Sequence, residues 1–408
     1  MKLNKYKLGE LVEVTRGASL SGQFYAEEGE LIRLTLGNFN MNGGGFKENT
    51  SKTDLYYTGT VKDEFILNKG DIITPLTEQS LGLLGTTARI PESGKYIQSQ
   101  DVALVKCKEG LLDPNFCYYL ISSSVVRQQL SAGAQQTKIR HTSPDKIKDC
   151  TVWMPDLEEQ KRIGRILIDI DEKITLNRQI NDNLEAMAKQ LYDYWFVQFD
   201  FPNEEGKPYK SSGGAMVWNE KLKREIPQGW NDCKIKDFMR IFTGKKDVSK
   251  AVPGNYKFFS CAPEPISSNE YIYDGYAVLV SGNGSYTGRV GFYKGKFDLY
   301  QRTYACVLDE DEHNISFFYY TLRYLFQPIY SGGKHGSSIP YIVLGDLADF
   351  CFAFNETICT KFVDATKPMF DEQLLRQKEI EALTKQRDEL LPLLMNGQAS
   401  VNYHLSAD

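Results

Sequence analysis

Hydrophobic and polar residues alternate in short runs over the first 155 residues. Runs rich in aliphatic and β-branched residues occur at 31–36, 71–74 and 97–105, and Gly, Asn or Lys-Gly turns separate them. Such runs are typical of short β-strands. The segments 114–123 and 124–130 predict two helices between them. The pattern therefore predicts a mixed α/β module over 1–155 with much irregular loop.

From Asp156 the spacing of hydrophobic residues becomes that of one long helix. Asp156 is suited to be its N-cap, and Glu158 and Glu159 favour the first turn. The positions spaced by three and four residues are Ile163, Leu167, Ile170, Ile174, Asn177, Asn181, Leu184, Ala188 and Leu191. This is a heptad seam with two asparagines, and polar seam residues fix register at a cost in stability. We predict a central helix over 156–200.

The same order of elements then recurs. Strand-like runs at 276–280, 289–293 and 300–308 predict a second module over 230–355, and a second long helix follows over 356–397. Its apolar positions are Phe370, Leu374, Ile380, Leu383, Leu390 and Leu394, with Gly397 suited to be the C-cap. The segment 201–229 is predicted as a linker, because its stretch 204–214 is rich in Gly, Ser and Lys and is expected to be exposed. Residues 398–408 form a short tail.

The recurrence is visible in the residues themselves. Residues 7–14 are echoed by 234–241, 115–120 by 316–321, and 133–139 by 333–339. The repeat is degenerate, so we expect one scaffold with two different surfaces. Two seamed helices of similar length would most simply pack against each other. The predicted fold is therefore α+β: two mixed α/β domains separated by two long antiparallel coiled-coil helices.

Composition restricts the class of protein. The chain has 408 residues, of which 41% are hydrophobic and 25% charged, and no apolar run approaches bilayer length. Its eight cysteines are scattered singly, which predicts reduced thiols in a cytoplasmic protein. The net charge of −5 argues mildly against nucleic-acid binding. The stretch 221–257, however, holds 10 basic and four acidic residues.

The common signatures of catalysis are missing from the sequence. The loop 282–289 has glycines but neither the spacing nor the Lys-Ser/Thr of a phosphate-binding loop. Glu205-Gly206-Lys207 matches only a three-residue fragment of a nuclease site. The four histidines have no neighbours at metal or triad spacing. We therefore predict no catalytic, cofactor or metal site in this chain.

Polar and basic side chains on predicted loops are the candidates for contacts with base edges and phosphates. In the first module they are Arg33, Thr35, Asn38, Thr77, Gln79, Arg89, Lys138, Arg140 and His141. In the second they are Ser260, Ser281, Asn283, Ser285, Tyr286, Thr287, Arg289, Lys334, His335 and Ser337. The side chains expected at phosphate or guanine are Arg33, Lys138, Arg140, Arg289 and Lys334. The alternative for the loop 281–289 is an ordinary Gly-rich turn.

These elements together resemble the specificity subunit of type I restriction-modification systems, over nearly the whole chain. The segment 155–160 with Ile163 resembles the usual start of that family's central helix, and 191–202 resembles its end. The segments 206–214 and 222–230 resemble the start of its second target-recognition domain. In the second copy the helix start lacks the glutamine of the first, reading Asn355-Glu356-Thr357.

The resemblance implies a division of labour. Each target-recognition domain reads one half of an asymmetric, split sequence in double-stranded DNA. The paired helices set the gap and dock two methyltransferase subunits. S-adenosylmethionine, ATP and Mg belong to those subunits and to the restriction subunits, with no membrane involved. Two other classes remain open from the residues: a single-chain nuclease or methyltransferase with an unrecognised site, and a protein-binding scaffold.

Overall fold

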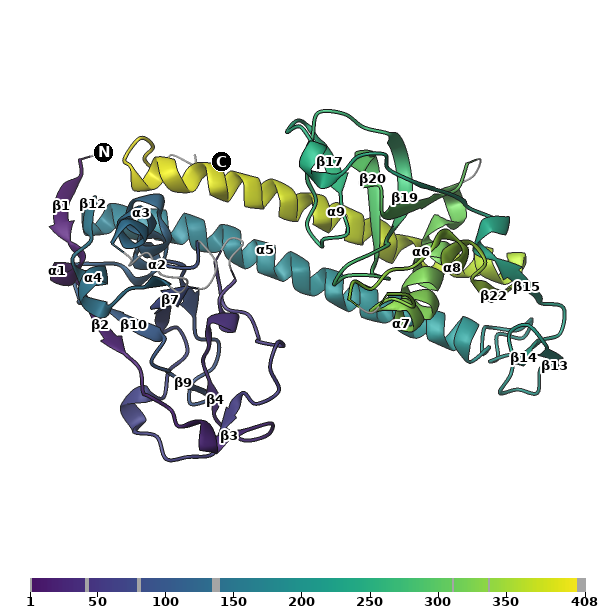
Figure 1. Cartoon of the computed structure of the whole chain (residues 1–408), viewed down its shortest axis with the longest axis horizontal. Helices are drawn as coiled ribbons and strands as arrows, with labels where there is room; N and C mark the ends of the chain where they lie inside the picture. The colour runs from purple at the N-terminus through teal and green to yellow at the C-terminus, as the bar shows by residue number, and fades with distance from the viewer. Residues whose placement is uncertain are drawn as a thin grey trace. The chain divides into compact units, whose positions relative to one another are not determined.

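The computed structural model describes residues 2–40, 44–78, 82–133, 140–309, 312–336 and 338–401. The chain forms two compact units. Unit 1 comprises Met1–Asn177 with Glu379–Asp408, and unit 2 comprises Arg178–Lys378. Two long helices, α5 (Leu157–Tyr192) and α9 (Glu356–Met395), each contribute to both units (Figure 1). The predicted combination of mixed α/β modules with two long helices is confirmed.

Unit 1 is built from short strands, as its alternating pattern predicts. Its four-stranded sheet has the order β2-β10-β6-β8, with bounds Val12–Arg16, Val102–Cys107, Ile72–Pro75 and Ala88–Arg89. A smaller sheet has the order β3-β5-β4-β9, with bounds Tyr25–Ala26, Tyr56–Tyr57, Ile32–Arg33 and Tyr96–Ile97. Two strand pairs complete the unit: β1 (Asn4–Lys7) with β12 (Thr151–Met154), and β7 (Thr77–Glu78) with β11 (Arg140–His141).

The helices of unit 1 are short apart from α5 and α9. They are α1 (Leu8–Leu11), α2 (Pro114–Ser122), α3 (Ser124–Ala132) and α4 (Pro144–Lys148), with 3-10 turns η1 (Gly22–Phe24), η2 (Leu36–Asn38) and η3 (Asp63–Phe65). The Asp113 side chain caps α2 by accepting from the Phe116 amide at 2.9 Å. At Gly164 a Cβ would lie 2.7 Å from the same amide nitrogen, so this glycine lets α5 approach α2 closely.

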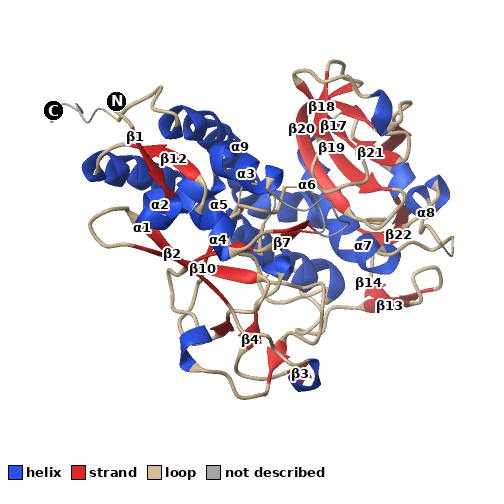
Figure 2. Cartoon of the chain, turned by 60° about the vertical axis from the view of Figure 1, so that its left-hand side comes forward, coloured by secondary structure: helices blue, strands red, loops and turns tan. Residues whose placement is uncertain are grey.

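Unit 2 has one larger sheet, whose strands are grouped together in Figure 2. The strand order is β16-β21-β19-β20-β17-β18, with bounds Arg240–Thr243, Thr303–Val307, Tyr273–Ser281, Val290–Leu299, Tyr256–Phe259 and Ile266–Ser268. β15 (Asn231–Lys234) pairs with β22 (Cys351–Phe354). The remaining elements are α6 (Ile315–Thr321), α7 (Gln327–Tyr330), α8 (Leu344–Ala348), the 3-10 turns η5 (Ile235–Asp237), η6 (Val248–Lys250) and η7 (Glu312–Asn314), and the π-helical turns η4 (Asp193–Val197) and η8 (Leu322–Phe326).

The sequence repeat is a repeat of strand pairing. The order β2-β10-β6-β8 of unit 1 recurs as β16-β21-β19-β20 in unit 2. The registers also agree: Leu104 lies opposite Ile73 in the first, and Ala305 lies opposite Leu279 in the second. The pair β1-β12 has its counterpart in β15-β22. The residues of these paired strands in one copy can therefore be assigned equivalents in the other.

The two long helices run antiparallel within each unit (Figure 1). In unit 1, Arg387 Nη1 donates to Asp171 Oδ1 at 2.8 Å, and Asn177 Nδ2 donates to Glu379 Oε2 at 3.0 Å. In unit 2, Gln373 Nε2 donates to the Asn181 carbonyl oxygen at 3.3 Å. Every predicted seam position of α5 and α9 is buried or half-buried. The heptad interpretation is therefore confirmed inside both units.

Three predicted strands are shorter than their sequence patterns indicate. The run 97–105 contains a turn at 99–101, closed by a bond from the Val102 amide to the Ser99 carbonyl at 3.0 Å. The run 300–308 contains the equivalent turn, closed by a bond from the Thr303 amide to the Tyr300 carbonyl at 3.0 Å. The run 31–36 keeps only the two residues of β4 as strand before η2 begins. Cross-strand pairing, which periodicity does not encode, decides these breaks.

The segment 201–229, predicted as a linker, is ordered. It contains the hairpin of β13 (Met216–Asn219) and β14 (Arg224–Pro227). Phe201 and Ile226 belong to the buried core of unit 2, together with Trp230. The aromatic and aliphatic residues at its two ends hold this Gly- and Ser-rich segment in place, because burying such side chains is favourable.

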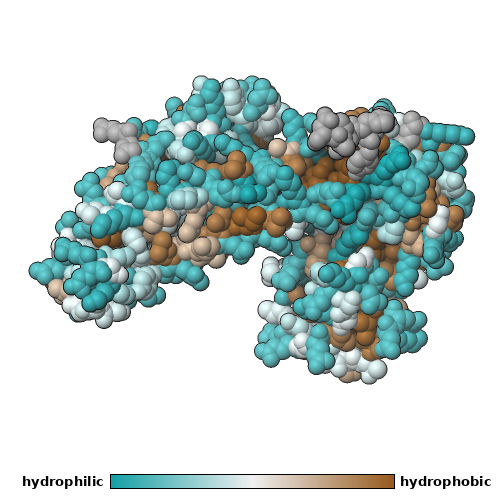
Figure 3. Space-filling model, turned by 180° about the vertical axis from the view of Figure 1, so that it is seen from behind, coloured by the Kyte–Doolittle hydropathy of each residue, from teal (hydrophilic) through white to brown (hydrophobic). Residues whose placement is uncertain are grey.

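Figure 3 shows a largely hydrophilic face with hydrophobic residues in separate patches. In the part of the chain that the structure describes, no helix has the length and apolar character needed to cross a bilayer. All eight cysteines are free thiols.

Candidate functional site

Equivalent loops gather at the strand ends of each module. In unit 1 the Leu76 amide donates to the Asp101 carbonyl, and the Thr142 amide donates to the Leu76 carbonyl, both at 2.8 Å. In unit 2 the Gly282 amide donates to the Arg302 carbonyl, and the Ile342 amide to the Gly282 carbonyl, both at 2.9 Å. The same three chain segments therefore meet in each copy. Within unit 1 the predicted loops around Thr77 and His141 therefore lie together. Within unit 2 the predicted loops around Asn283 and Lys334 lie together through Tyr341.

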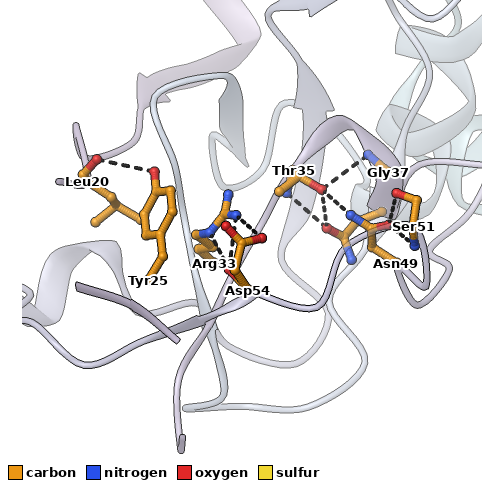
Figure 4. Close-up of polar contacts among 9 residues, drawn as sticks. Leu20, Tyr25, Arg33, Thr35, Gly37, Asn49, Ser51 and Asp54 are labelled. Atoms are coloured by element: carbon orange, nitrogen blue, oxygen red, sulfur yellow. Dashed lines mark hydrogen bonds and ion pairs between the residues drawn. The ribbon is translucent and has the colours of Figure 1, made fainter. Parts of the chain in front are cut away.

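Arg33 is engaged inside unit 1 (Figure 4). Its guanidinium donates to the Asp54 carbonyl oxygen from Nε and Nη2, and to Asp54 Oδ1 at 3.1 Å from Nη2. The guanidinium carbon also lies 3.8 Å from the centre of the Tyr25 ring. Arg33 is 6% exposed. Its charge therefore supports the loop that ends β4 and is largely withheld from the surface.

Thr35 forms a hydrogen-bond network with Asn49 (Figure 4). Asn38 joins this network, because its Oδ1 accepts from the Thr35 amide at 2.9 Å. Thr35 Oγ1 accepts from the Gly37 amide at 3.2 Å and from Asn49 Nδ2 at 2.9 Å. Asn38 is buried, and its Nδ2 donates to the Lys47 carbonyl at 3.2 Å. These bonds fix one wall of a polar cavity of about 330 Å³. Its polar lining comprises Arg33, Thr35, Asn49, Ser51, Lys52, Ser99, Gln100 and Asp101.

The pair β7-β11 places Thr77 opposite His141 and Glu78 opposite Arg140. Glu78 is buried, and its Oε2 accepts from the Leu83 and Leu84 amides at 2.9 and 3.0 Å. Arg140 Nη1 lies 3.7 Å from Glu78 Oε1 and donates to Ser131 Oγ at 3.0 Å. His141 is exposed, whereas Thr77 is 8% exposed. The Arg140–Glu78 pair thus organises the loop that displays His141.

Arg89 makes its hydrogen bonds within unit 1. Its Nη2 donates to Asn115 Oδ1 at 2.7 Å and to the Pro114 carbonyl at 3.2 Å. The guanidinium carbon lies 5.2 Å from the centre of the Tyr118 ring. These contacts join β8 to the start of α2.

In unit 2, Ser260 holds the position that Thr35 holds in unit 1. Its Oγ accepts from the Ala262 amide at 3.1 Å, as Thr35 does from Gly37. Ser281 is buried, and its hydroxyl donates to the Cys261 carbonyl at 3.1 Å. Asn283 Oδ1 accepts from the Cys261 thiol at 3.1 Å. Cys261 therefore fastens the loop after β17 to the loop after β19.

The Gly-rich loop 281–289 has a fixed backbone and an exposed tip. Thr287 is buried, and its hydroxyl lies 2.6 Å from the Gly284 carbonyl and 2.9 Å from the Pro340 carbonyl. Arg289 Nη2 donates to the Ala262 carbonyl at 2.7 Å, and burial lowers the pKa of its guanidinium. Ser285 and Tyr286 are exposed at the tip. The loop is therefore a turn that also presents two polar side chains.

Lys334 and His335 lie on the facing loop. Lys334 Nζ lies 4.8 Å from the centre of the Tyr330 ring. His335 Nε2 lies 3.1 Å from Asp346 Oδ2, and its ring lies 5.3 Å from that of Tyr341. Both residues are exposed. The predicted sites Gln79, Lys138 and Ser337 fall outside the described residues.

Sequence reasoning missed the turns 99–101 and 300–302. Both turns lie inside runs that the hydrophobic pattern predicts as strands, so the sequence does not indicate their side chains as loop contacts. An alignment of the two copies gives the signal that finds these turns. A glutamine is followed by a charged residue in both copies, as Gln100-Asp101 in the first and Gln301-Arg302 in the second. Across the described ranges, no group of three His, Cys, Asp or Glu side chains is placed to hold a metal ion.

Comparison with known proteins identifies the family. The model of the type I restriction modification DNA specificity domain matches residues 2–186 and 227–353. The chain is 25% identical over 324 residues to the type I restriction enzyme MjaIX specificity subunit of Methanocaldococcus jannaschii, covering 72% of this chain and 71% of that protein. It is 32% identical over 180 residues to the type I restriction enzyme EcoDI specificity subunit of Escherichia coli, covering 43% of this chain and 39% of that protein.

A solved structure shows the same fold. The type I restriction-modification S subunit from M. genitalium superposes with a TM-score of 0.61 at 17% identity, covering 97% of this chain and 96% of that one. With the family match over both modules, the chain belongs to the type I restriction-modification DNA specificity family. It is a specificity subunit with two recognition modules, and catalysis lies in partner subunits.

Proposed function

We propose that this chain selects a split, asymmetric sequence in double-stranded DNA, with residues 1–155 reading one half and residues 230–355 the other. One observation carries the proposal: equivalent loop positions hold different side chains on the same backbone. The register assigns Thr77 to Asn283 and His141 to Tyr341. Groups of different size and hydrogen-bonding capacity suit different base edges. Two different half-sites require the same backbone in each module but different side chains on its loops.

The helices 156–200 and 356–397 set the distance between the half-sites in this proposal. They also dock two methyltransferase subunits, and restriction subunits join the assembly through these. S-adenosylmethionine is then held by the methyltransferases, and ATP and Mg by the restriction subunits. Exposed apolar side chains on the helices, including Leu176, Met187 and Leu375, support a docking role because solvent-exposed apolar groups gain from being covered.

The electrostatics restrict how the DNA is held. The chain carries a net charge of −5, so affinity depends on local cations and not on the overall field. Contacts from a few exposed lysines and arginines predict a modest dependence of binding on salt, because each phosphate contact releases about one counterion.

Coexpression with the methyltransferase subunits, followed by mapping of modified adenines, tests the proposal. The expected result is one split motif. Replacing residues 1–155 by the matching module of a relative should change one half of the motif and leave the other intact. An unsplit motif, or a change in both halves, contradicts the assignment of one half to each module.

A paired deletion tests the spacer. Residues 170–176 face residues 381–387 across the antiparallel helices, as the Asp171–Arg387 bond shows. Removing both heptads shortens the pair by about 10 Å at about 1.5 Å per residue, and the gap in the motif should shrink by about three base pairs at about 3.4 Å each. Removing 170–176 alone should abolish binding, because the seam of α9 loses its match. An unchanged gap would overturn the ruler.

A further inference from the structure

The turns 99–101 and 300–302 have the same backbone in both modules. Each is closed by an amide-to-carbonyl bond across three residues, Val102 to Ser99 and Thr303 to Tyr300, both at 3.0 Å. A second bond reaches the last carbonyl of each turn, from Leu76 to Asp101 and from Gly282 to Arg302. Parallel bridges, Ala18 with Ser99 and Lys246 with Tyr300, hold the first residue. Side chains at equivalent positions therefore leave the backbone from matched, rigid points.

The side chains of these turns are free to bind. In the part of the chain that the structure describes, the side chains of Gln100, Asp101, Gln301 and Arg302 make no hydrogen bond or ion pair. Gln100, Gln301 and Arg302 are exposed and Asp101 is half-buried. By contrast, three other arginines donate hydrogen bonds to backbone carbonyl groups of the protein: Arg33, Arg89 and Arg289. Fixed backbones with unengaged polar tips are preorganised for a ligand, since little further ordering is needed.

The chemistry at the last turn position is opposite in the two copies. Asp101 offers two acceptor oxygens and Arg302 offers a fork of donors. Asp101 borders the polar cavity that Thr35, Asn49 and Ser51 also line. Arg302 adjoins the loop cluster of unit 2, because its carbonyl accepts from the Gly282 amide at 2.9 Å and from the Cys261 thiol at 3.4 Å. Each turn thus belongs to the candidate site of its own module.

We infer that these turns read bases, and that Asp101 and Arg302 set the different preferences of the two half-sites. The inference rests on the proposed function and names its specificity-determining residues. Arginine binds the O6 and N7 acceptors of guanine with two parallel bonds, and aspartate accepts from the amino group of cytosine. Gln100 and Gln301 offer both a donor and an acceptor, which suits the N6 and N7 edge of adenine.

The test uses the full chain assembled with its methyltransferase subunits and a DNA library with both half-sites randomised. Arg302→Ala should weaken binding to the preferred sequence by about tenfold to hundredfold and relax the preference at one position of one half-site. Asp101→Asn should relax one position of the other half-site. Each variant should leave the opposite half-site unchanged. Arg302→Lys should restore charge without restoring full guanine preference, because lysine lacks the planar fork.

Two outcomes overturn the inference. The first is a uniform loss of affinity in Arg302→Ala over all sequences, with a salt slope lower by about one and full rescue by Arg302→Lys, which would mark a phosphate contact. The second is an unchanged motif in both variants. Arg240→Ala, at an exposed arginine that begins β16 and pairs with Asp309 away from the loops of the candidate site, is the matched control and should leave the motif intact. A wild-type complex that selects no motif at all would instead refute the proposed function.

Discussion

The two modules share backbone bonds and differ in side-chain bonds. Lys7 Nζ donates to the backbone carbonyl of Asp149 at 2.6 Å, whereas its counterpart Lys234 donates to the carboxylate of Asp349 at 2.8 Å. The tyrosines of α2 and of the α6–η8 segment both bond a carboxylate on α5, but the carboxylate is Asp171 in unit 1 and Glu185 in unit 2. The path of the chain is therefore what is duplicated, while the side-chain chemistry has diverged around it.

Glycine shows how strictly that path is kept. A Cβ at Gly17 would overlap the carbonyl oxygen of Gln98, and a Cβ at Gly244 would overlap that of Leu299. Both glycines end the first strand of the sheet and let it pass directly over the segment that leads into the 99–101 or 300–302 turn. The Arg16-Gly17 and Thr243-Gly244 endings of the sequence echo are therefore steric requirements of the shared frame.

The largest effect is expected from these glycines. Gly17→Ala and Gly244→Ala should each destabilise their own unit by about 3 kcal/mol or more, because rigid backbone must move. Hydrogen exchange in β2 and in β16 measures the two units separately. Gly22→Ala and Gly345→Ala are the controls, since an added Cβ there meets nothing closer than 3.9 Å. Native protection in either variant would show that the frame tolerates displacement.

The tyrosine–carboxylate bonds should differ in strength between the units. Tyr119 donates to Asp171 Oδ2 at 2.6 Å, and Tyr119→Phe should cost about 1.5 kcal/mol because a charge-assisted bond is lost. Tyr324→Phe should cost less, because Glu185 keeps Gln373 at 3.3 Å, Tyr319 at 3.4 Å and Arg323 at 3.8 Å. Asp171 keeps the Arg387 guanidinium at 2.8 Å. Urea unfolding of both variants beside Tyr6→Phe, a tyrosine without a hydroxyl partner among the described residues, measures the difference. Equal costs would remove the proposed asymmetry.

The two seam asparagines provide a third comparison. Asn177 is 1% exposed and donates to Glu379, whereas the Asn181 Oδ1 atom is buried without a hydrogen-bond partner among the described residues. Asn181→Leu should therefore stabilise the chain by about 1 kcal/mol, and Asn177→Leu should destabilise it by a similar amount. Urea unfolding separates the two signs. A stabilising Asn177→Leu would indicate that its bond to Glu379 contributes only register and no net stability.

The smallest effect is expected from the lysine pairs, and it depends on pH. Hydrogen bonds from Lys234 and Lys236 lower the pKa of Asp349 to about 2. The folded pKa lies below the unfolded value of about 3.9, so this contribution is present above about pH 4 and is lost as pH falls toward about 2. The stability difference between the wild type and Asp349→Asn should shrink over that window. Asp149→Asn is the control, because Lys7 donates to the backbone carbonyl of Asp149, which does not titrate. A pH-dependent stability difference of the same size in Asp149→Asn would contradict the role given to the lysine–Asp349 bonds.

Helix boundaries were the most predictable part of the fold. The Asp156 cap is present, with Oδ1 accepting from the Glu159 amide at 3.0 Å, and Gly397 adopts a φ of +70° after α9. The start of α5 contains a glutamine, Gln160, that the start of α9 lacks, and this glutamine has a structural role. Gln160 is buried and accepts from the Asp113 amide at 3.0 Å, while α9 relies on Asn355, which accepts from the Ile358 amide at 3.0 Å. Caps and seams are local, so the sequence alone encodes them.

Candidate site residues were less predictable, because loop side chains have competing uses. Residue type suggested Arg33, Arg89 and Arg289 as contacts for DNA, yet each donates to a protein carbonyl at 2.7 to 3.2 Å. Arg302 has the same chemistry and no such partner among the described residues. Their difference depends on which carbonyl groups fall within reach, and that is decided by segments far away in the sequence.

The duplication, the two long helices with their polar seam positions and the family can all be read from the amino-acid sequence. These follow from periodicity, capping and motif, which act over a few residues. The tertiary structure was needed to show that the runs 97–105 and 300–308 contain turns, and that the side chains of Asp101 and Arg302 lie on those turns without a hydrogen-bond partner among the described residues. The reason is physical: strand pairing satisfies backbone groups across the sheet, and that pairing determines which side chains remain free to bind.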